Sequence, residues 1–251
     1  MSPPPPSSPP SHPLSAEQSA AHSSIREWLK NKSRIRDKPF YTLGGYAGSG
    51  KSTLVRHLMD LLPTLGYYSP ALCTLSGKAA SVLRQKGNER ACTIHSIFYY
   101  SVKTETGMRF FPRSSKQIRE VCDCIIIDEA SMVSVQIHNQ LLSAGLPVLY
   151  IGDHGQLPPI GDDPGIMRSL DSELKTIHRQ ALDSPIIRYA HAIRTGDFTP
   201  INGIQHISRS HPGWLSGPFS RNPNLQCIVS LNDQRVAINS AIRTAMKFAE
   251  P

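Results

Sequence analysis

Two kinds of apolar pattern alternate along the chain. Short continuous apolar runs, such as residues 124–127, are typical of strands buried on both faces of a parallel sheet. Other segments carry apolar residues at helical spacing, most clearly at Leu54, Val55, Leu58, Leu61 and Leu62. Because strands and helices alternate, the sequence predicts an open, mostly parallel α/β sheet with helices on its faces.

The same patterns place the remaining elements. Helices are expected at 15–30, 76–86, 133–142, 184–194 and 232–248, and strands at 40–43, 69–75, 148–151 and 225–229, with 173–179 a strand that runs into a turn. A capping box formed by Ser15 and Gln18 is expected to start the first helix. The last strand and helix resemble the beginning of a second α/β unit.

Two segments interrupt this order. Residues 1–13 hold seven of the 21 prolines, mixed with serine, and this composition predicts a disordered tail. Residues 99–121 are basic and aromatic and predict an inserted hairpin with its tip at 104–107. The expected domains are therefore a first α/β domain at 14–170, with an insertion at about 97–121, and a linker with the start of a second domain at 171–251.

Composition narrows the class of protein further. Lys and Arg outnumber Asp and Glu by 27 to 19, and the net charge of +8 is compatible with a nucleic-acid partner without establishing one. Five scattered cysteines argue against a disulfide framework, so we expect reduced thiols that mostly fill the core. Neither a membrane span nor a secretory signal is evident. We expect a cytoplasmic protein, or a nuclear or organellar one if the source is eukaryotic.

The residues after the first predicted strand match G-x-x-x-x-G-K-[ST]. In a strand–loop–helix context such a loop turns its N–H groups onto phosphates, and the helix N-terminus favours their charge. We expect Lys51 to reach the β- and γ-phosphates and Ser52 to offer a hydroxyl to Mg²⁺. An ordinary glycine-rich turn is the alternative. The predicted nucleotide contacts here are Gly45, Ala47, Gly48, Ser49, Gly50, Lys51, Ser52 and Thr53.

Polar residues that suit nucleotide hydrolysis follow the later strands. Asp128 and Glu129 come directly after the buried run at 124–127. Asp128 would hold Mg²⁺, and Glu129 would orient and deprotonate the attacking water. Gln156 follows the next strand and could contact the γ-phosphate, and Arg179 could reach it from across a cleft. The alternatives are a prolyl turn for Gln156 and an ordinary surface arginine for Arg179.

Taken together, these motifs resemble those of the superfamily 1B DNA helicases, in particular the RecD-like and phage Dda-like group. The similarity also includes TLSGKAA at 74–80, TIHS at 93–96, IIIDEASM at 125–132 and GDHGQLPPIG at 152–161. It implies a RecA-like P-loop fold, ATP and Mg²⁺ as cofactors, and 5′-to-3′ unwinding driven by ATP hydrolysis. Single-stranded DNA or a single/double-strand junction would be the partner, with other replication, repair or recombination proteins.

The resemblance also implies residue roles. Gln18 would read the adenine edge, Gln156 would couple nucleotide state to DNA, and Arg179 would sense the γ-phosphate. Contacts to the DNA backbone would come from Ser76, Lys78, Thr93 and His95. Phe110 or Phe111, in the insertion where the family has a small strand-splitting domain, would stack on a base or wedge the fork; a small core under the hairpin is the alternative.

The sequence departs from the family in two places. Leu75 and Ser76 stand where the family usually has Pro-Thr, and motifs V and VI, with most of the second RecA-like domain, are absent. We expect full activity to belong to a longer or complemented protein. A nucleic-acid-binding or regulatory module with a vestigial ATPase is the alternative. A small-molecule P-loop kinase is disfavoured, because TIHS, GDHGQLPP and the IHRQ segment at 177–180 would have no role in it.

Overall fold

A computed structural model describes residues 13–105, 107–178, 183–199 and 201–204, with 218–219, 222, 225, 227–229 and 231–246. The chain divides into two compact units, Met1–Asp197 and Phe198–Pro251. The tail predicted at 1–13 lies outside the described residues apart from Pro13.

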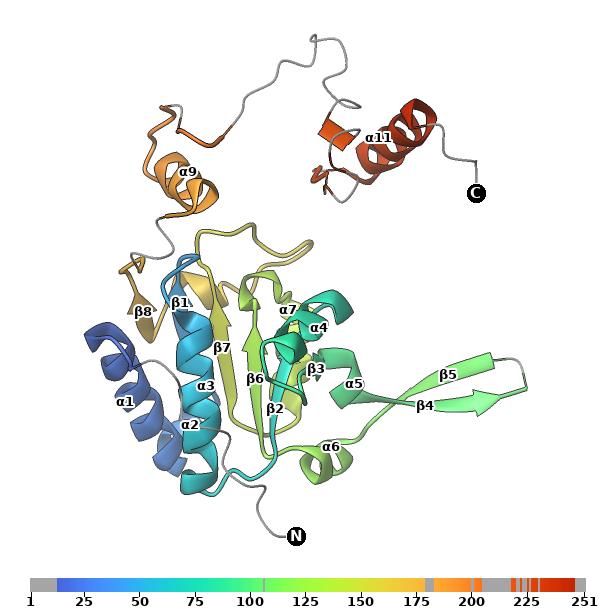
Figure 1. The fold of residues 1–251 in the computed structure, drawn as a ribbon. Coiled ribbons are helices and arrows are strands. Elements are labelled where there is room, and N and C mark those ends of the chain that lie inside the picture. Colours follow the sequence, from blue (N-terminus) through green and yellow to red (C-terminus); the bar gives the residue numbers. More distant parts are fainter. Residues whose placement is uncertain are drawn as a thin grey trace. The chain divides into compact units, whose positions relative to one another are not determined.

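The first unit is built on a six-stranded sheet whose neighbouring strands all run parallel (Figure 1). Its strands are β1 (Phe40–Gly45), β2 (Pro70–Thr74), β3 (Cys92–Thr93), β6 (Cys124–Asp128), β7 (Val148–Gly152) and β8 (Ser172–Leu174), in the order β3-β2-β6-β7-β1-β8. The predicted parallel α/β sheet is confirmed. Strand β8 lies beyond residue 170 and still pairs with β1, while the predicted domain limits stay predictions.

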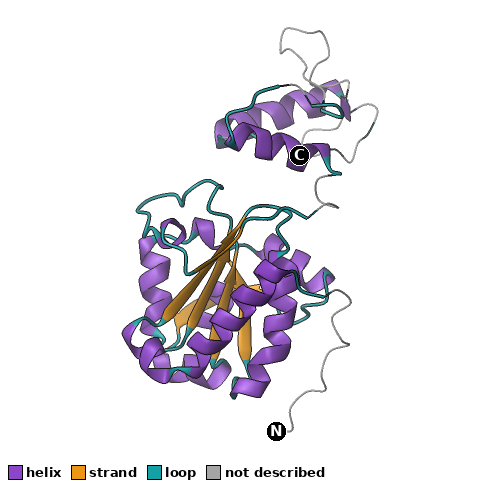
Figure 2. Ribbon diagram, turned by 90° about the vertical axis from the view of Figure 1, so that its left-hand side faces the viewer, coloured by secondary structure: helices purple, strands orange, loops and turns teal. Residues whose placement is uncertain are grey.

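Helices cover both faces of this sheet (Figure 2). The helices of this unit are α1 (Ala16–Lys30), α2 (Lys32–Asp37), α3 (Lys51–Leu61), α4 (Gly77–Gln85), α5 (Ile94–Phe98), α6 (Ser115–Val121) and α7 (Val135–Ser143), with α9 (Pro185–Arg194) beyond the ends of the strands. Short 3₁₀ turns lie at η1 (Leu62–Leu65), η2 (Ala130–Met132) and η3 (Ile166–Arg168). The helices predicted at 15–30, 76–86, 133–142 and 184–194 are thus present, with ends shifted by one or two residues.

Alternate residues of each strand serve two separate apolar cores, because successive side chains of a strand point to opposite faces. Ile126 and Leu149 share a buried cluster with residues of α1 and α3. Ile125 and Ile127 share another with residues of α5, α6 and α7. Full burial of one such side chain stabilises the fold by about 1.5–3 kcal/mol, so the continuous apolar run at 124–127 fixes β6 in the middle of the sheet.

The start of α1 follows from its first residues. The Gln18 N–H donates to Ser15 Oγ at 3.3 Å, and the Ser15 N–H donates to Gln18 Oε1 at 2.8 Å. This reciprocal capping box confirms the prediction. Ile25 and Leu29 of the same helix are buried in the core.

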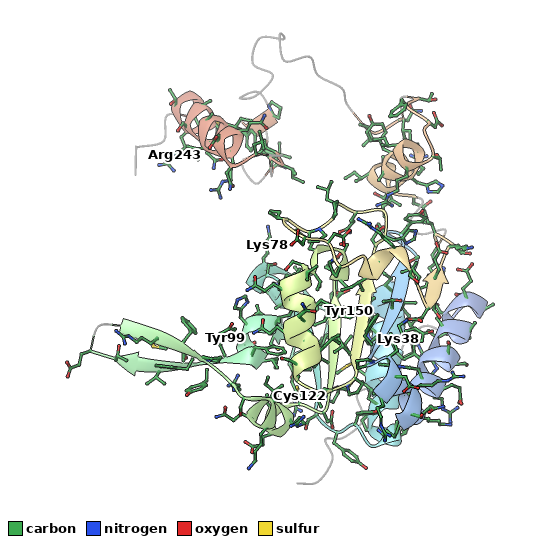
Figure 3. The ribbon with its side chains drawn as sticks, turned by 180° about the vertical axis from the view of Figure 1, so that it is seen from behind. Lys38, Lys78, Tyr99, Cys122, Tyr150 and Arg243 are labelled. Carbon is green, nitrogen blue, oxygen red and sulfur yellow. The ribbon has the colours of Figure 1, made fainter. Side chains whose placement is uncertain are left out.

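The insertion forms a two-stranded antiparallel hairpin of β4 (Tyr99–Thr104) and β5 (Gly107–Pro112), which projects from the sheet (Figure 1). Tyr99 lies at its base (Figure 3). There, Arg113 Nη1 donates to the carbonyl oxygens of Ser96, Ile97 and Tyr99 at 2.7–2.8 Å. One of the basic residues of the insertion therefore anchors the hairpin to α5.

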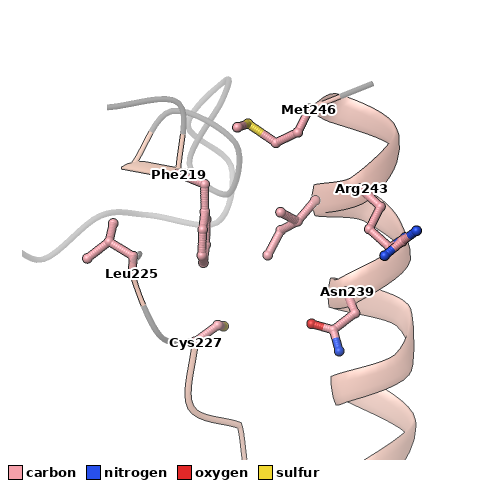
Figure 4. Close-up of a pocket in the computed structure, with 7 residues that line it drawn as sticks. Phe219, Leu225, Cys227, Asn239, Arg243 and Met246 are labelled. Carbon is pink, nitrogen blue, oxygen red and sulfur yellow. The ribbon is translucent and has the colours of Figure 1, made fainter. Parts of the chain in front are cut away.

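The second unit contains α11 (Asn232–Ala245). A hollow of about 400 Å³ in this unit is lined by Phe219, Leu225, Cys227, Asn239, Ile242, Arg243 and Met246 (Figure 4). The strand expected at 225–229 is wrong for the residues described there, since Leu225 and residues 227–229 are not in a strand. A strand needs a neighbour to bond its backbone N–H and C=O groups, and the described residues of this unit include none.

Candidate nucleotide-binding site

The glycine-rich loop joins β1 to α3, as its sequence context predicts. Gly48 and Gly50 have φ values of +83° and +84°, which non-glycine residues rarely adopt. Space is also restricted, because a β-carbon at Gly50 would overlap the Gln18 side-chain amide. Within the loop the Ser49 N–H donates to the Tyr46 carbonyl at 3.1 Å, and Ser49 itself is buried. The loop is therefore held in one shape by backbone geometry and close packing.

Lys51 begins α3 and folds back onto the loop. Its ammonium donates to the carbonyl oxygens of Gly45 at 2.6 Å and Tyr46 at 3.1 Å. Burial lowers the pKa of Lys51, and the nearby carboxylates of Asp153, Glu129 and Asp128 partly oppose that change. The structure thus brings Lys51 near three acidic residues at the C-terminal ends of β6 and β7. Ser52 and Ala47 are exposed beside it.

Asp128 and Glu129 lie where β6 ends. Burial is the main cause that raises the pKa of Asp128, with the adjacent Glu129 adding to it and Lys51 opposing it. Among the described residues, Glu129 is the one non-glycine residue with a positive φ, 59°. Such a backbone costs about 1–2 kcal/mol and commonly occurs at functional sites. The exposed Glu129 and the partly buried Asp128 therefore lie in different environments.

The loop after β7 faces the turn after β6. Ser131 Oγ is 3.4 Å from Gln156 Oε1, and the Gln156 N–H donates to the Asp153 carbonyl at 3.0 Å. Ser131, Asp153 and Gln156 contribute to the lining of a hollow of about 220 Å³. Gln156 is therefore close to the segment that carries Asp128 and Glu129.

Sequence reasoning missed a cluster at this loop. Asp153 is fully buried, and its Oδ2 accepts a hydrogen bond from Arg194 Nη2 at 3.0 Å. The Arg194 guanidinium also lies 4.9 Å from the centre of the Tyr46 ring, and the Tyr46 and His154 ring centres are 4.5 Å apart. The end of α9 is thereby joined to both loops. No local pattern singles out Arg194 among the many arginines of the chain.

Gln18 reaches the loop from the first turn of α1. Its Nε2 donates to the Gly50 carbonyl at 3.0 Å, while its Oε1 accepts from the Ser15 N–H. Gln18 is buried, with an exposed fraction of 3%. It therefore supports the phosphate loop as well as the helix cap, and its role toward adenine stays a prediction.

The segment after β8 runs beside the same loop. Glu17 Oε2 accepts from the N–H groups of Lys175 and Thr176, both at 3.0 Å, and the Thr176 N–H is the main cause that lowers the pKa of Glu17. The His178 N–H donates to the Gly48 carbonyl at 3.0 Å. These contacts bring the chain to the phosphate loop just before Arg179, which lies outside the described residues.

The residues expected to contact DNA lie at the C-terminal ends of two neighbouring strands, β2 and β3, and in the helices that follow them. Ser76 follows β2 and caps α4, and Thr93 is the last residue of β3 and caps α5. Each accepts a hydrogen bond from the N–H three residues later. Lys78 is exposed on α4 (Figure 3), and the ring of His95 stacks on that of Tyr99. Because Thr74 pairs with Thr93 across β2 and β3, the two segments begin at one edge of the sheet.

The two hairpin phenylalanines differ in exposure. Phe110 is 71% exposed and Phe111 39% exposed, and Phe111 stacks on Tyr100 with ring centres 5.7 Å apart. The alternative of a small core beneath the hairpin does not hold for Phe110. The exposed Phe110 ring is therefore accessible for stacking by another planar group.

A parallel sheet whose first strand passes through a glycine-rich loop into a helix, with an acidic pair after a nearby strand, defines a P-loop NTPase with a RecA-like fold. The family model described as an AAA domain matches residues 14–212. The chain belongs to this family and, within it, to the superfamily 1B helicases of the RecD, Dda and Pif1 group.

Individual relatives agree with this assignment. The ATP-dependent RecD2 DNA helicase of Deinococcus radiodurans is 32% identical over 162 residues, which cover 62% of this chain and 22% of that protein. The ATP-dependent DNA helicase dda of Enterobacteria phage T4 is 27% identical over 197 residues, covering 73% of this chain and 43% of dda. The chain therefore spans less than half the length of both.

A solved structure of a Pif1 helicase from Bacteroides has the same fold. It superposes with a TM-score of 0.50 at 20% identity, covering 92% of this chain and 57% of that one.

The described residues contain no helix with the length and apolar character of a membrane span.

Proposed function

We propose that this chain is the ATP-binding motor domain of a DNA helicase, in which the loop Gly45–Thr53 binds MgATP and single-stranded DNA stimulates hydrolysis. The observation that carries the proposal is the placement of Lys51 close enough to Asp128, Glu129 and Asp153 for their charges to interact. A phosphate-binding lysine near the carboxylates after β6 and β7 is an arrangement suited to phosphoryl transfer. The 5′-to-3′ direction rests on the family resemblance.

The site residues divide the work as follows. The loop N–H groups and Lys51 would hold the phosphates. Gln18, which donates to the Gly50 carbonyl, would contact the adenine edge. A divalent ion would be held by Ser52, Asp128 and the phosphates themselves. This donor set fits Mg²⁺, which keeps few protein ligands, and the described residues include no cluster of three or more His, Cys, Asp or Glu side chains for a dedicated metal site. Bound Mg²⁺ would supply charge neutralisation at the phosphates.

Hydrolysis would use the exposed carboxylate of Glu129. It accepts a proton from the attacking water as the water oxygen bonds to the γ-phosphorus, while the bond to the bridging oxygen breaks and ADP leaves. Gln156 would report the state of the γ-phosphate through Ser131 to the turn that holds Glu129. Arg179 would contribute a further positive charge to the γ-phosphate.

Single-stranded DNA would lie over Ser76, Lys78, Thr93 and His95 and reach Phe110 and Phe111 on the hairpin. The hydroxyls of Ser76 and Thr93 accept capping bonds, which leaves their O–H groups able to donate to phosphates. Aromatic stacking on Phe110 would not depend on sequence. Unwinding itself would belong to the whole protein, in which residues 171–251 would link to a second RecA-like domain.

ATP turnover, measured with and without an oligothymidine, tests this function. We expect single-stranded DNA to raise turnover, and Glu129→Gln to lower turnover about 10²-fold or more while ATP binding persists, since a general base contributes about 10²–10⁴-fold. Absence of turnover with intact DNA binding would instead favour a nucleic-acid-binding or regulatory module with a vestigial ATPase.

A further inference from the structure

Two thiols lie side by side on β2 and on its neighbour β3, which is an edge strand of the sheet. Cys73 of β2 and Cys92 of β3 are register partners, and their sulfur atoms are 3.7 Å apart. Cys73 is buried, with an exposed fraction of 1%, whereas Cys92 is partly exposed. Cys92 is therefore the more exposed residue of the pair, and Cys73 is the buried one.

The backbone around this pair already has the spacing that a disulfide requires. Disulfides form across Cα separations of about 4.4–6.8 Å, and neighbouring strands lie about 4.8 Å apart. Bonded sulfurs are about 2.05 Å apart. The two sulfurs would thus have to approach by only about 1.7 Å, which side-chain rotation and a small strand shift can supply.

The surroundings give the two sulfurs different reactivity. The hydrogen bond shared with Cys73, aided by Ser96 and the charge of Arg84, lowers the pKa of Cys92 against the opposing effect of burial. The same hydrogen bond, with burial, raises the pKa of Cys73. Since the thiolate is the nucleophile, Cys92 is suited to attack and Cys73 to resolve. The nearby Cys122 is buried with its thiol 3.7 Å from the Ile118 carbonyl.

We propose that Cys73 and Cys92 form a reversible thiol–disulfide site that reacts with small disulfides of the glutathione class. The Cys92 thiolate attacks one sulfur of the oxidised disulfide, forms a mixed disulfide and releases one small thiol. Cys73 then loses its proton and attacks the Cys92 sulfur, which forms the Cys73–Cys92 bond and releases the second small thiol. Two cysteines are oxidised and one small disulfide is reduced.

The effect of this bond rests on the proposed function. β2 leads into Ser76 and Lys78, and Thr93 follows Cys92 directly. Formation of the disulfide pulls the ends of β2 and β3 together, and this moves the segment with Ser76 and Lys78 relative to the segment that begins at Thr93. A DNA strand that contacts both would no longer fit the same spacing, so the disulfide form binds single-stranded DNA at least three-fold more weakly.

The test treats the full chain with glutathione disulfide, blocks free thiols by alkylation, and maps disulfides by peptide mass spectrometry. Binding of a fluorescent oligothymidine is measured before oxidation, after it, and after reduction with dithiothreitol. Cys92→Ser and Cys73→Ala remove one member each, and thermal melting confirms that each variant folds. Cys227→Ser, which changes an exposed cysteine of the second unit, is the matched control.

We expect a Cys73–Cys92 peptide in the wild type and in Cys227→Ser, with the loss of DNA affinity reversed by reduction, and neither change in the other two variants. Oxidation that leaves Cys73 and Cys92 unlinked overturns the site. If the Cys73–Cys92 disulfide forms but the affinity for oligothymidine does not change, the proposed effect of the disulfide on DNA binding is wrong. If the reduced chain binds no oligothymidine, the proposed function fails instead, and the peptide map still decides the disulfide.

Discussion

The Arg194 guanidinium donates from Nη2 to Oδ2 of Asp153 at 3.0 Å, and the Asp153 side chain is fully buried. The other oxygen, Oδ1, accepts from the Gly155 N–H at 2.9 Å. Arg194 is the last residue of α9, whereas Asp153 directly follows β7. A buried ion pair thus joins two elements that lie 41 residues apart, beside the phosphate loop.

We expect Arg194→Ala to destabilise the first unit because it removes the guanidinium that is hydrogen-bonded to the buried Asp153 carboxylate. Breaking a buried pair costs about 3–5 kcal/mol, and we expect about 2–3 kcal/mol here because Arg194 is partly exposed to water. Adding Asp153→Asn to Arg194→Ala should recover part of the loss, as measured by urea unfolding. A double variant no more stable than Arg194→Ala would contradict this role of the pair.

Gly50→Ala should disturb the phosphate loop in two ways, through backbone strain and through a steric clash. Gly50 and Gly66 both have positive φ, +84° and +88°, so alanine at either costs about 1–2 kcal/mol. Only at Gly50 would the new methyl group also displace Gln18, since nothing lies near a β-carbon at Gly66. We therefore expect Gly50→Ala to be the less stable variant and to weaken ATP binding at least ten-fold. Equal effects of the two variants on stability and ATP affinity would argue against the Gln18 contact.

Asp128→Asn should stabilise the nucleotide-free chain. Burial raises the pKa of Asp128 in the folded state, so ionising this carboxyl at neutral pH costs folding free energy. The cost is present above the raised pKa and disappears as the pH falls through it. We expect the variant to gain about 0.5–1 kcal/mol at neutral pH in urea unfolding, and to lose this advantage in acid. A variant less stable than the wild type at neutral pH would contradict this.

Phe110→Ala should weaken DNA binding without changing stability. Stacking of a base on an aromatic ring contributes about 1–3 kcal/mol, so affinity for oligothymidine should fall by about 5- to 150-fold. The ring is 71% exposed, so the melting temperature should hardly change. Tyr68→Ala, which removes a 59% exposed ring outside the hairpin, is the control. If the wild type, Phe110→Ala and Tyr68→Ala bind oligothymidine with equal affinity, Phe110 does not contact DNA.

Local pattern was sufficient for much of the fold. The apolar run at 124–127, the Ser15–Gln18 capping box and the strand–loop–helix order around Lys51 are confirmed, because each depends on residues close together in sequence. The strand expected at 225–229 failed because apolar content alone does not supply a pairing partner.

Long-range contacts could not be predicted in the same way. The pairings of Arg194 with Asp153, of Glu17 with Thr176 and of Cys73 with Cys92 depend on the strand order and on where α9 packs. Neither follows from periodicity. Motif spacing placed Asp128, Glu129 and Gln156 after neighbouring strands, whereas Arg194, the partner of Asp153, comes from a helix in which no pattern singles it out.

Titration of the full chain with ATP, in the presence and absence of Mg²⁺, tests the central claim most directly. The wild type should bind ATP saturably and more tightly with Mg²⁺, and Lys51→Ala should lose at least ten-fold in affinity because no other cation lies in the loop Gly45–Thr53. Lys78→Ala, which changes a lysine assigned to DNA, should bind ATP as the wild type does. Equal ATP affinity in the wild type and Lys51→Ala would contradict the assignment of this loop.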